Sequence, residues 1–250
     1  MLADTKFEFG VDEHGKLHLI DEILTVGDEQ FQRRCVEKFD DFKDAGKDME
    51  YTLFVPSGYD KARKSPLVIA LHGLGGNPQQ FMRTRGLTEQ AEKRGYIVIA
   101  PAAPSTGLFF EGGARIIPEF LKMILAEYKI QDGKFHIAGP SNGGIAAMHV
   151  AAANPQYFAS VTAFPGYMWE PSTAKLAAIS KMCVFLYVGE DDEYMWHGEM
   201  RKEAQFLRGL GTIASYTVEK GQPHRMETLA GTHASRLFDG FEQTKQGCVR

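Results

Sequence analysis

One serine of this chain lies in a pattern that can make its hydroxyl a nucleophile. Ser141 is central in Gly-Pro-Ser-Asn-Gly-Gly at 139–144, between an apolar run at 134–138 and an alanine-rich run at 145–153. Gly-x-Ser-x-Gly between a strand and a helix is a nucleophile elbow, a turn so sharp that glycine is favoured at its flanks. We therefore expect Ser141 to project above the end of a sheet, within reach of a base and a substrate, as in serine hydrolases.

An acidic run lies where an orienting acid is needed. A serine hydroxyl needs a base, and the base needs an acid; on this elbow both follow the serine, the acid first. The residues 190–193, Glu-Asp-Asp-Glu, follow the apolar run 183–188. Asp192 is our first choice for the acid and Asp191 our second, with Glu190 and Glu193 behind. The alternative is that this run is only a solvated surface loop.

A histidine follows the last predicted strand, where the base belongs in this chain order. His224 ends the sequence Gly-Gln-Pro-His at 221–224, which comes after the run 214–220. His233 is the rival, but it falls in the first turn of the final helix, where packing or capping is the expected role. His197 precedes the last strand, so the order argues against it. The histidines expected to be structural are His14, His18, His136 and His149.

Backbone N–H groups must also bind the negative charge that develops on the substrate oxygen. One is expected from Asn142, directly after the nucleophile. The other is expected from Leu74, in the glycine-rich loop Leu-His-Gly-Leu-Gly-Gly-Asn at 71–77. This loop lacks the Lys-Ser/Thr ending of a phosphate-binding loop and does not match Gly-x-Gly-x-x-Gly.

Alternating elements from Pro66 onward can position these residues. The repeated strand–helix units predict an α/β fold with a mostly parallel central sheet, helices on both faces and the active site at the carboxyl ends of the strands. We expect one domain over 1–250, with a catalytic core over 51–250. The predicted strands are 51–55, 67–71, 97–100, 135–138, 158–164, 183–188 and 214–218. Asn77 is expected to cap the first helix, 78–94, and the other predicted helices are 116–128, 145–153, 173–179, 198–208 and 232–243.

The first 50 residues read as antiparallel strands with one helical insertion. Two short apolar runs, at 7–9 and 17–20, flank a polar stretch at 12–15 and predict a hairpin. Phe31, Cys35, Phe39 and Phe42 recur at helical spacing, so we expect an amphipathic helix over Gln30 to Lys43. Such a helix is a candidate for covering the cleft or for forming a homodimer.

Composition sets limits on partners and compartment. The 250 residues are 44% hydrophobic, and 28 basic against 32 acidic residues give a net charge of −4. This balance gives no electrostatic case for nucleic acid or an anionic membrane as a partner. No apolar run reaches the ~18 residues of a membrane span. The polar N-terminus lacks the apolar core of a secretory signal.

The three cysteines show no metal-like spacing and their number is odd. Cys183 opens an apolar run, and we interpret it as a small buried hydrophobe. We therefore expect a reduced, cytoplasmic protein.

With these motifs assembled, the chain resembles the α/β-hydrolase superfamily, and within it the small esterases of the polyhydroxybutyrate depolymerase and feruloyl esterase type, near the dienelactone hydrolases. The resemblance is carried by the segments 51–56, 71–77, 139–144, 189–192 and 221–224. It implies Ser141, Asp192 and His224 as a catalytic triad, with Leu74 and Asn142 at the oxyanion hole. The histidines show no His-x-x-x-His or comparable ligand spacing, so we expect no metal, and we expect no cofactor. One departure is Pro140, where histidine is common in this group.

Aromatic residues follow several predicted strand ends and are candidates for a substrate pocket. They are Phe109, Phe110, Trp169 and Trp196. An apolar wall suits an aryl or medium acyl group, so we expect a small, soluble ester as substrate. The alternative is that these side chains fill the core beneath the loops.

Other functions share this fold. A thioesterase or lysophospholipase of the carboxylesterase group is one rival, and a prolyl oligopeptidase-like peptidase is another. A catalytically silent binding protein is a third, although such proteins usually lack a triad member and none is missing here.

Overall fold

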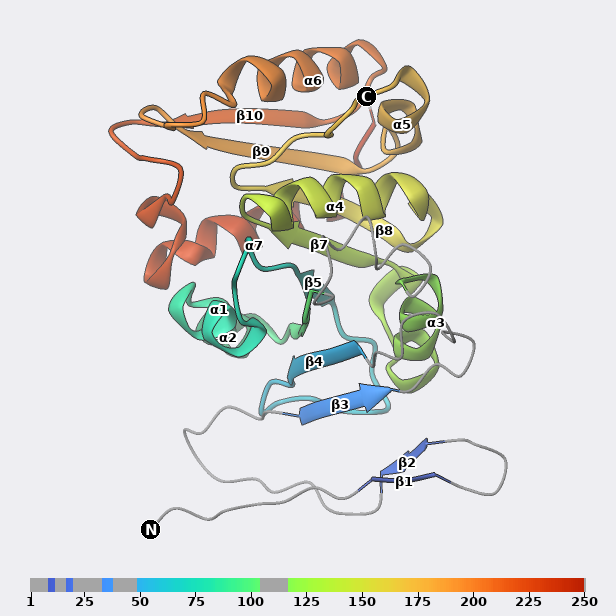
Figure 1. The fold of residues 1–250 in the computed structure, drawn as a ribbon. Coiled ribbons are helices and arrows are strands. Elements are labelled where there is room, and N and C mark those ends of the chain that lie inside the picture. Colours follow the sequence, from blue (N-terminus) through green and yellow to red (C-terminus); the bar gives the residue numbers. More distant parts are fainter. Residues whose placement is uncertain (1–8, 12–16, 20–32, 38–48, 104–116, 250) are drawn as a thin grey trace, which may run out of the picture.

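An eight-stranded mixed sheet forms the centre of the molecule (Figure 1). The computed structural model describes residues 9–11, 17–19, 33–37, 49–103 and 117–249. The strand order is β10-β9-β8-β7-β5-β6-β4-β3; the strands from β10 to β6 pair in parallel, and β4 pairs antiparallel with both β6 and β3. The bounds are β3 Arg33–Glu37, β4 Met49–Phe54, β5 Leu67–Ala70, β6 Ile97–Pro101, β7 Phe135–Gly139, β8 Phe158–Ala163, β9 Cys183–Gly189 and β10 Ala214–Glu219.

Helices cover both faces of this sheet (Figure 1). On one face lie α3 Ile117–Glu127, α4 Asn142–Ala153, α5 Thr173–Ala178 and α6 His197–Gly209. On the other lie α1 Pro78–Thr84, α2 Leu87–Arg94 and α7 Ser235–Gln243. Successive residues of β5 alternate between the two cores, Ile69 on one face and Val68 on the other, so the strand is buried throughout. The predicted fold class is confirmed.

The first helical segment differs from its prediction. Asn77 caps α1, accepting the N–H of Gln80 at 3.1 Å, and Pro78 takes the first helical position, as expected. The predicted single helix to Arg94 is wrong, because the chain breaks at Gly86, where φ is +69°. A side chain at Gly86 would also overlap the backbone of Gly231, so the break packs against the start of the last helical region.

The N-terminal predictions have mixed outcomes. The hairpin is confirmed: β1 Phe9–Val11 pairs antiparallel with β2 Leu17–Leu19. The amphipathic helix over Gln30 to Lys43 is wrong, because Arg33–Glu37 forms β3 along the edge of β4. Residues four apart share a face in a strand as well as in a helix, so the spacing of Phe31, Cys35 and Phe39 fits both, and only the step of three to Phe42 is specific to a helix. Pairing with the open edge of β4 then decides for the strand.

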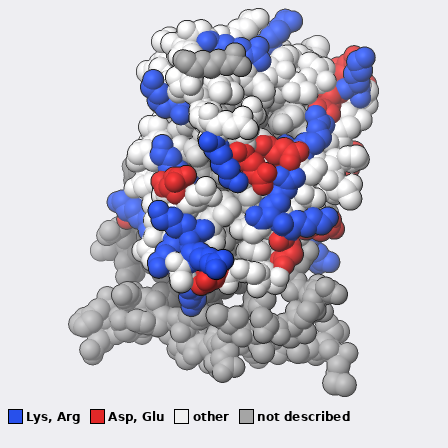
Figure 2. Space-filling model, turned by 180° about the vertical axis from the view of Figure 1, so that it is seen from behind, with Lys and Arg blue, Asp and Glu red and all other residues white. Residues whose placement is uncertain are grey.

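Charged side chains on the face seen in Figure 2 are interspersed rather than segregated by sign. Arg94 contacts Asp239 and Glu242 of α7 at 2.7 and 3.3 Å, which ties α2 to α7. Arg236 of α7 pairs with Glu219 at 2.6 Å, and this pairing lowers the pKa of Glu219. None of the helices in the described ranges is both long and apolar enough to cross a membrane.

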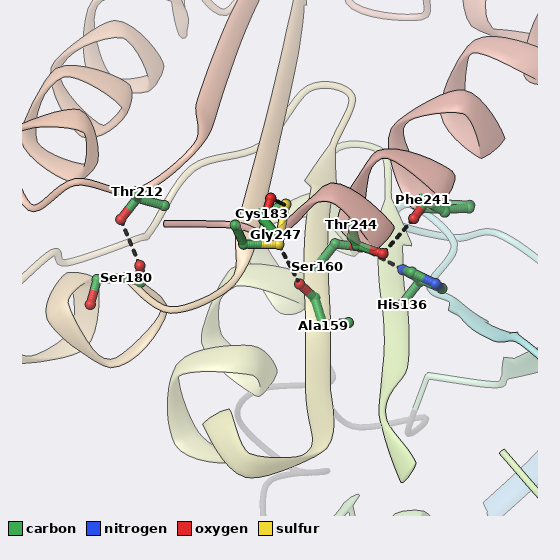
Figure 3. The surroundings of a disulfide bond; sticks show 10 residues. His136, Ala159, Ser160, Ser180, Cys183, Thr212, Phe241, Thr244 and Gly247 are labelled. Carbon is green, nitrogen blue, oxygen red and sulfur yellow. Dashed lines mark hydrogen bonds between the residues drawn. A yellow bond between two sulfur atoms is a disulfide. The ribbon is translucent and has the colours of Figure 1, made fainter. Parts of the chain in front are cut away.

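A disulfide joins the start of β9 to the C-terminal segment (Figure 3). Cys183 and Cys248 are bonded, and the sulfur of Cys183 lies 3.6 Å from the carbonyl oxygen of Gly247. Cys183 is buried as expected, but the prediction that it is unpaired is wrong. The partner lies 65 residues away, where no local spacing reveals it. The expectation of a reduced compartment rested partly on unpaired cysteines, and disulfides persist mainly in oxidising compartments.

Removing this disulfide is expected to lower the free energy of unfolding by about 2–5 kcal/mol, because the link restricts the unfolded chain over a long loop. In thermal melts, Cys248→Ser should lower Tm by about 10 °C and abolish any further effect of dithiothreitol. Cys35→Ser is the matched control and should retain the wild-type Tm and its response to reductant. A wild-type Tm that does not respond to reductant would contradict the prediction.

Candidate active site

The chain turns sharply between β7 and α4, and Ser141 lies at this turn. Its backbone has φ +54° and ψ −125°, a conformation rare for a residue with a side chain. A Cβ at Gly139 would come within 2.5 Å of the carbonyl oxygen of Leu71, and one at Gly143 would overlap the same atom. Glycine is therefore required on both sides, because the turn packs directly on the backbone after β5. The predicted elbow is confirmed as local geometry.

Three polar side chains from three different loops meet above this turn. The Oγ of Ser141 lies 2.9 Å from Nε2 of His224, and Nδ1 of His224 lies 3.1 Å from Oδ1 of Asp192. The Asp192 side chain is fully buried. A carboxylate only accepts hydrogen bonds, so Nδ1 carries the proton and Nε2 is left to accept from the serine hydroxyl. The arrangement equips His224 to remove a proton from Ser141.

The four acidic residues after β9 make different contacts. Asp192 faces the histidine, whereas Asp191 is exposed and its backbone N–H donates to Gln222. Glu190 accepts the N–H of Gly221, and Glu193 accepts the N–H of His224, both at 3.0 Å. The bond from His224 lowers the pKa of Glu193. The interpretation of the run as only a solvated loop is therefore wrong, because the carboxylates of Glu190, Asp192 and Glu193 contact the loop that carries the histidine.

The glycine-rich loop at 71–77 passes beside the nucleophile. A Cβ on Gly73 would lie 3.6 Å from the Cβ of Ser141. His72 is buried, and burial lowers its pKa; its Nε2 accepts the N–H of Ala103 at 3.2 Å, while its Nδ1 lies 2.8 Å from the carbonyl oxygen of Gly73. A neutral imidazole can accept at one nitrogen and donate at the other, so His72 shapes this loop. Leu74 itself is 80% exposed.

An aromatic wall, which we define as Tyr167, Trp169, Tyr194 and Trp196, stands beside the histidine. The rings of Tyr194 and Trp196 meet the His224 ring edge-on, with centroids 4.6 and 4.7 Å away. Tyr167 contacts Trp196 at 5.1 Å and Trp169 at 6.0 Å. Trp169 and Trp196 are thus brought together near the site. Phe109 and Phe110 lie outside the described residues.

The loop after β8 connects the elbow to this wall, a role that sequence reasoning missed. The carbonyl of Pro165 accepts the N–H of Ser141 at 2.7 Å. Gly166 packs against Gly144, where a Cβ would lie within 2.6 Å of the helix backbone. A proline and a glycine directly after a predicted strand were the available signals.

His233, His136 and His197 lie apart from the three meeting side chains, and His14 is outside the described residues. His233 is exposed at the start of the last helical region, and His136 is buried, bonded to Ser160 at 2.8 Å, with its pKa lowered to about 3 by burial. His197 opens α6, where its carbonyl accepts the hydroxyl of Tyr216. In the described part of the chain, no group of three or more metal-ligating side chains gathers.

The parallel sheet, its two helical layers and the elbow at a strand end define an α/β-hydrolase fold. A family model described as "Putative esterase" matches residues 114–240, just over half of the chain, and the chain belongs to this family. A second model, described as SAICAR synthetase, matches only residues 1–33.

Curated relatives are similar over part of their length. The chain is 27% identical over 137 residues to feruloyl esterase B of Talaromyces funiculosus, covering 50% of this chain and 38% of the relative. It is 24% identical over 143 residues to acetylxylan esterase A of Aspergillus oryzae, covering 52% and 46%. The chain thus spans less than half the length of these relatives.

Solved structures agree on the fold. A thermostable esterase superimposes with a TM-score of 0.68 at 20% identity, covering 96% of this chain and 70% of the other. A ferulic acid esterase superimposes with a TM-score of 0.67 at 19% identity, covering 87% and 98%. At these identities the likeness establishes the architecture.

Proposed function

We propose that this protein is a serine esterase that cleaves carboxylic esters of small, soluble substrates through an acyl-enzyme. The observation that carries the proposal is the continuous contact from Ser141 through His224 to Asp192, on loops after three parallel strands. Its family membership and the esterase names of its relatives support the same reaction class.

Acylation begins when Ser141 attacks the ester carbonyl and His224 takes the hydroxyl proton. The buried carboxylate of Asp192 holds the imidazole in the required tautomer and stabilises the imidazolium. His224 then returns the proton to the leaving alcohol. A water molecule, activated by the same histidine, releases the acid and restores the serine hydroxyl.

The oxyanion is bound by the backbone N–H groups of Leu74 and Asn142 in this proposal. Two observations support it: the loop at 71–77 lies against Ser141, and within the described residues neither N–H donates to an acceptor. Asn142 is the first residue of α4, so its N–H has no partner inside the helix and the positive end of the helix dipole adds to the effect.

The aromatic wall supports an aryl or medium acyl group on the substrate. Trp169 and Tyr194 are 49% and 61% exposed, so their rings present apolar surface next to the reacting histidine. Flat aromatic rings pack well against such a wall, in edge-to-face or offset contacts. This observation favours an aryl ester over an aliphatic thioester.

A substrate panel tests the proposal. Initial rates on methyl ferulate, p-nitrophenyl acetate, an acyl-CoA and an aminoacyl arylamide should show kcat/KM for the two esters that carry an aromatic group at least about tenfold above the others, a difference of ~1.4 kcal/mol. Preference for the acyl-CoA would indicate a thioesterase, and preference for the arylamide a peptidase. No turnover and no labelling of Ser141 by a fluorophosphonate would indicate a binding protein.

A further inference from the structure

A buried acid on α6 has no role in the mechanism above. Glu203 is 4% exposed, and its Oε1 accepts the backbone N–H of Met168 at 2.8 Å. Its Oε2 is buried without a hydrogen-bond partner among the described residues. An ionisable side chain is costly to bury, so its position on the inner side of the helix calls for a reason.

The residue held by Glu203 lies within the aromatic wall. Met168 is fully buried between Tyr167 and Trp169, and it anchors the loop from which those rings project. The next residue is held as well: His149 of α4 forms a hydrogen bond with the backbone of Trp169. Two ionisable side chains from two helices therefore fix consecutive residues of this loop.

We propose that Glu203 is a positioning residue whose protonated form holds the loop 165–169, and with it the aromatic wall beside His224, in the arrangement that receives substrate, and whose ionisation loosens that loop. The substrate-binding role of the wall rests on the proposed function, whereas the effect of Glu203 on the loop does not. The path is Glu203 to Met168, then Tyr167 to Trp196, which contacts His224.

The surroundings of Glu203 favour its neutral form. Burial raises its pKa to about 8; the hydrogen bond from the Met168 N–H opposes this rise without cancelling it, and Glu199 one turn earlier on α6 adds to it. Once ionised, the carboxylate would have one N–H donor and, among the described residues, no basic partner. A charge buried with so little compensation shifts the balance toward a form in which Glu203 reaches water and releases Met168.

The ionisable groups on the neighbouring elements do not replace that missing partner. In the loop, the pKa of Tyr167 is raised, first by burial and then by Glu199 and Glu203. On β10, the hydroxyl of Tyr216 donates to the carbonyl of His197, and on α5 the ammonium of Lys175 donates to the carbonyl of Glu170. Tyr187 of β9 belongs to the core on the other face of the sheet.

His149 changes its charge at a lower pH than Glu203, so the two ionisations can be told apart. Burial lowers the pKa of His149 below 6.5, followed by the influence of Lys175, while its bond to Trp169 opposes the change. It is therefore neutral throughout the range in which Glu203 ionises. A transition above pH 7 can be assigned to Glu203 without it.

The chain carries its own reporter, because its two tryptophans, Trp169 and Trp196, both belong to the wall. Tryptophan emission of the wild type, recorded from pH 6 to 9.5, should change with a midpoint near pH 8. Glu203→Gln keeps a carbonyl oxygen for the Met168 N–H and cannot ionise, so its emission should be flat over this range.

Glu199→Gln is the matched control on the same helix. It should retain the transition and move the midpoint to lower pH, because the like charge that raises the pKa of Glu203 is removed. A transition that persists unchanged in Glu203→Gln, or that is absent from the wild type, would overturn the inference. If Glu203→Gln does not fold, hydrogen exchange of the Met168 N–H in the wild type decides: it should speed up above pH 8 more than neighbouring amides.

Kinetics give a second readout. From pH 7 to 9, KM for methyl ferulate should rise at least about threefold in the wild type and stay constant in Glu203→Gln, with a smaller change in kcat, because the wall binds substrate and does not react. If no ester is turned over, the proposed function fails and the fluorescence still tests Glu203. If esters are turned over with a flat tryptophan emission, the inference about Glu203 fails alone.

Discussion

Replacing Ser141 by alanine is expected to lower kcat for ester hydrolysis by about 10³-fold or more, because nucleophile, base and acid act as a unit. The serine hydroxyl lies 2.9 Å from Nε2 of His224, and alanine leaves that nitrogen without its proton donor. Steady-state rates on p-nitrophenyl acetate measure the loss. A fluorophosphonate should label the wild type and leave the variant unlabelled.

A second variant separates the loss of chemistry from damage to the fold. Ser141→Gly also removes the hydroxyl, but glycine adopts the φ of +54° without strain. In urea unfolding, its free energy of unfolding should therefore exceed that of Ser141→Ala by about 1–2 kcal/mol. Both variants should be inactive. Substantial hydrolysis by either variant would sink the proposed mechanism. Equal stability would show that the turn stores little strain.

The elbow could be predicted from sequence because its determinants are local. Glycines at 139 and 143 are needed where the backbone meets Leu71, and that need appears in a stretch of six residues. The order of acid and base was equally predictable, since parallel strands bring their carboxyl ends to one edge. The choice between Asp192 and Asp191 could not be settled from sequence. The two residues are adjacent and of one type, and the turn after β9 decides which side chain points toward the histidine.

Features that depend on distant partners were not predictable. Cys183 meets Cys248 only because the C-terminal segment returns to the start of β9. The apolar spacing around Cys35 fits both a helix and a strand, and the free edge of β4 decides between them. Glu203 resembles any glutamate on an amphipathic helix until the loop after β8 covers it.

Asp192→Ala is expected to lower kcat by about 10³- to 10⁴-fold, as removal of the acid does in serine proteases with such a triad. The side chain is fully buried and is the acceptor for Nδ1 of His224, so its loss frees the imidazole to take the wrong tautomer and removes the charge that stabilises the imidazolium. Asp191→Ala is the matched control: the neighbouring carboxylate is exposed, and kcat should change less than about threefold. An equal loss of kcat in Asp191→Ala would show that Asp192 is not the triad acid.

Asp192→Asn should be less damaging than Asp192→Ala for a reason specific to this site. The Oδ1 that faces His224 also accepts the N–H of Tyr194 at 2.9 Å. An amide nitrogen in that position would oppose the Tyr194 donor, so the amide oxygen should occupy it and continue to accept from His224. The tautomer is then kept and only the negative charge is lost. In kcat against pH, Asp192→Asn should retain more activity than Asp192→Ala across the range; the reverse order would mean that the amide has turned and that Tyr194 does not fix the acid.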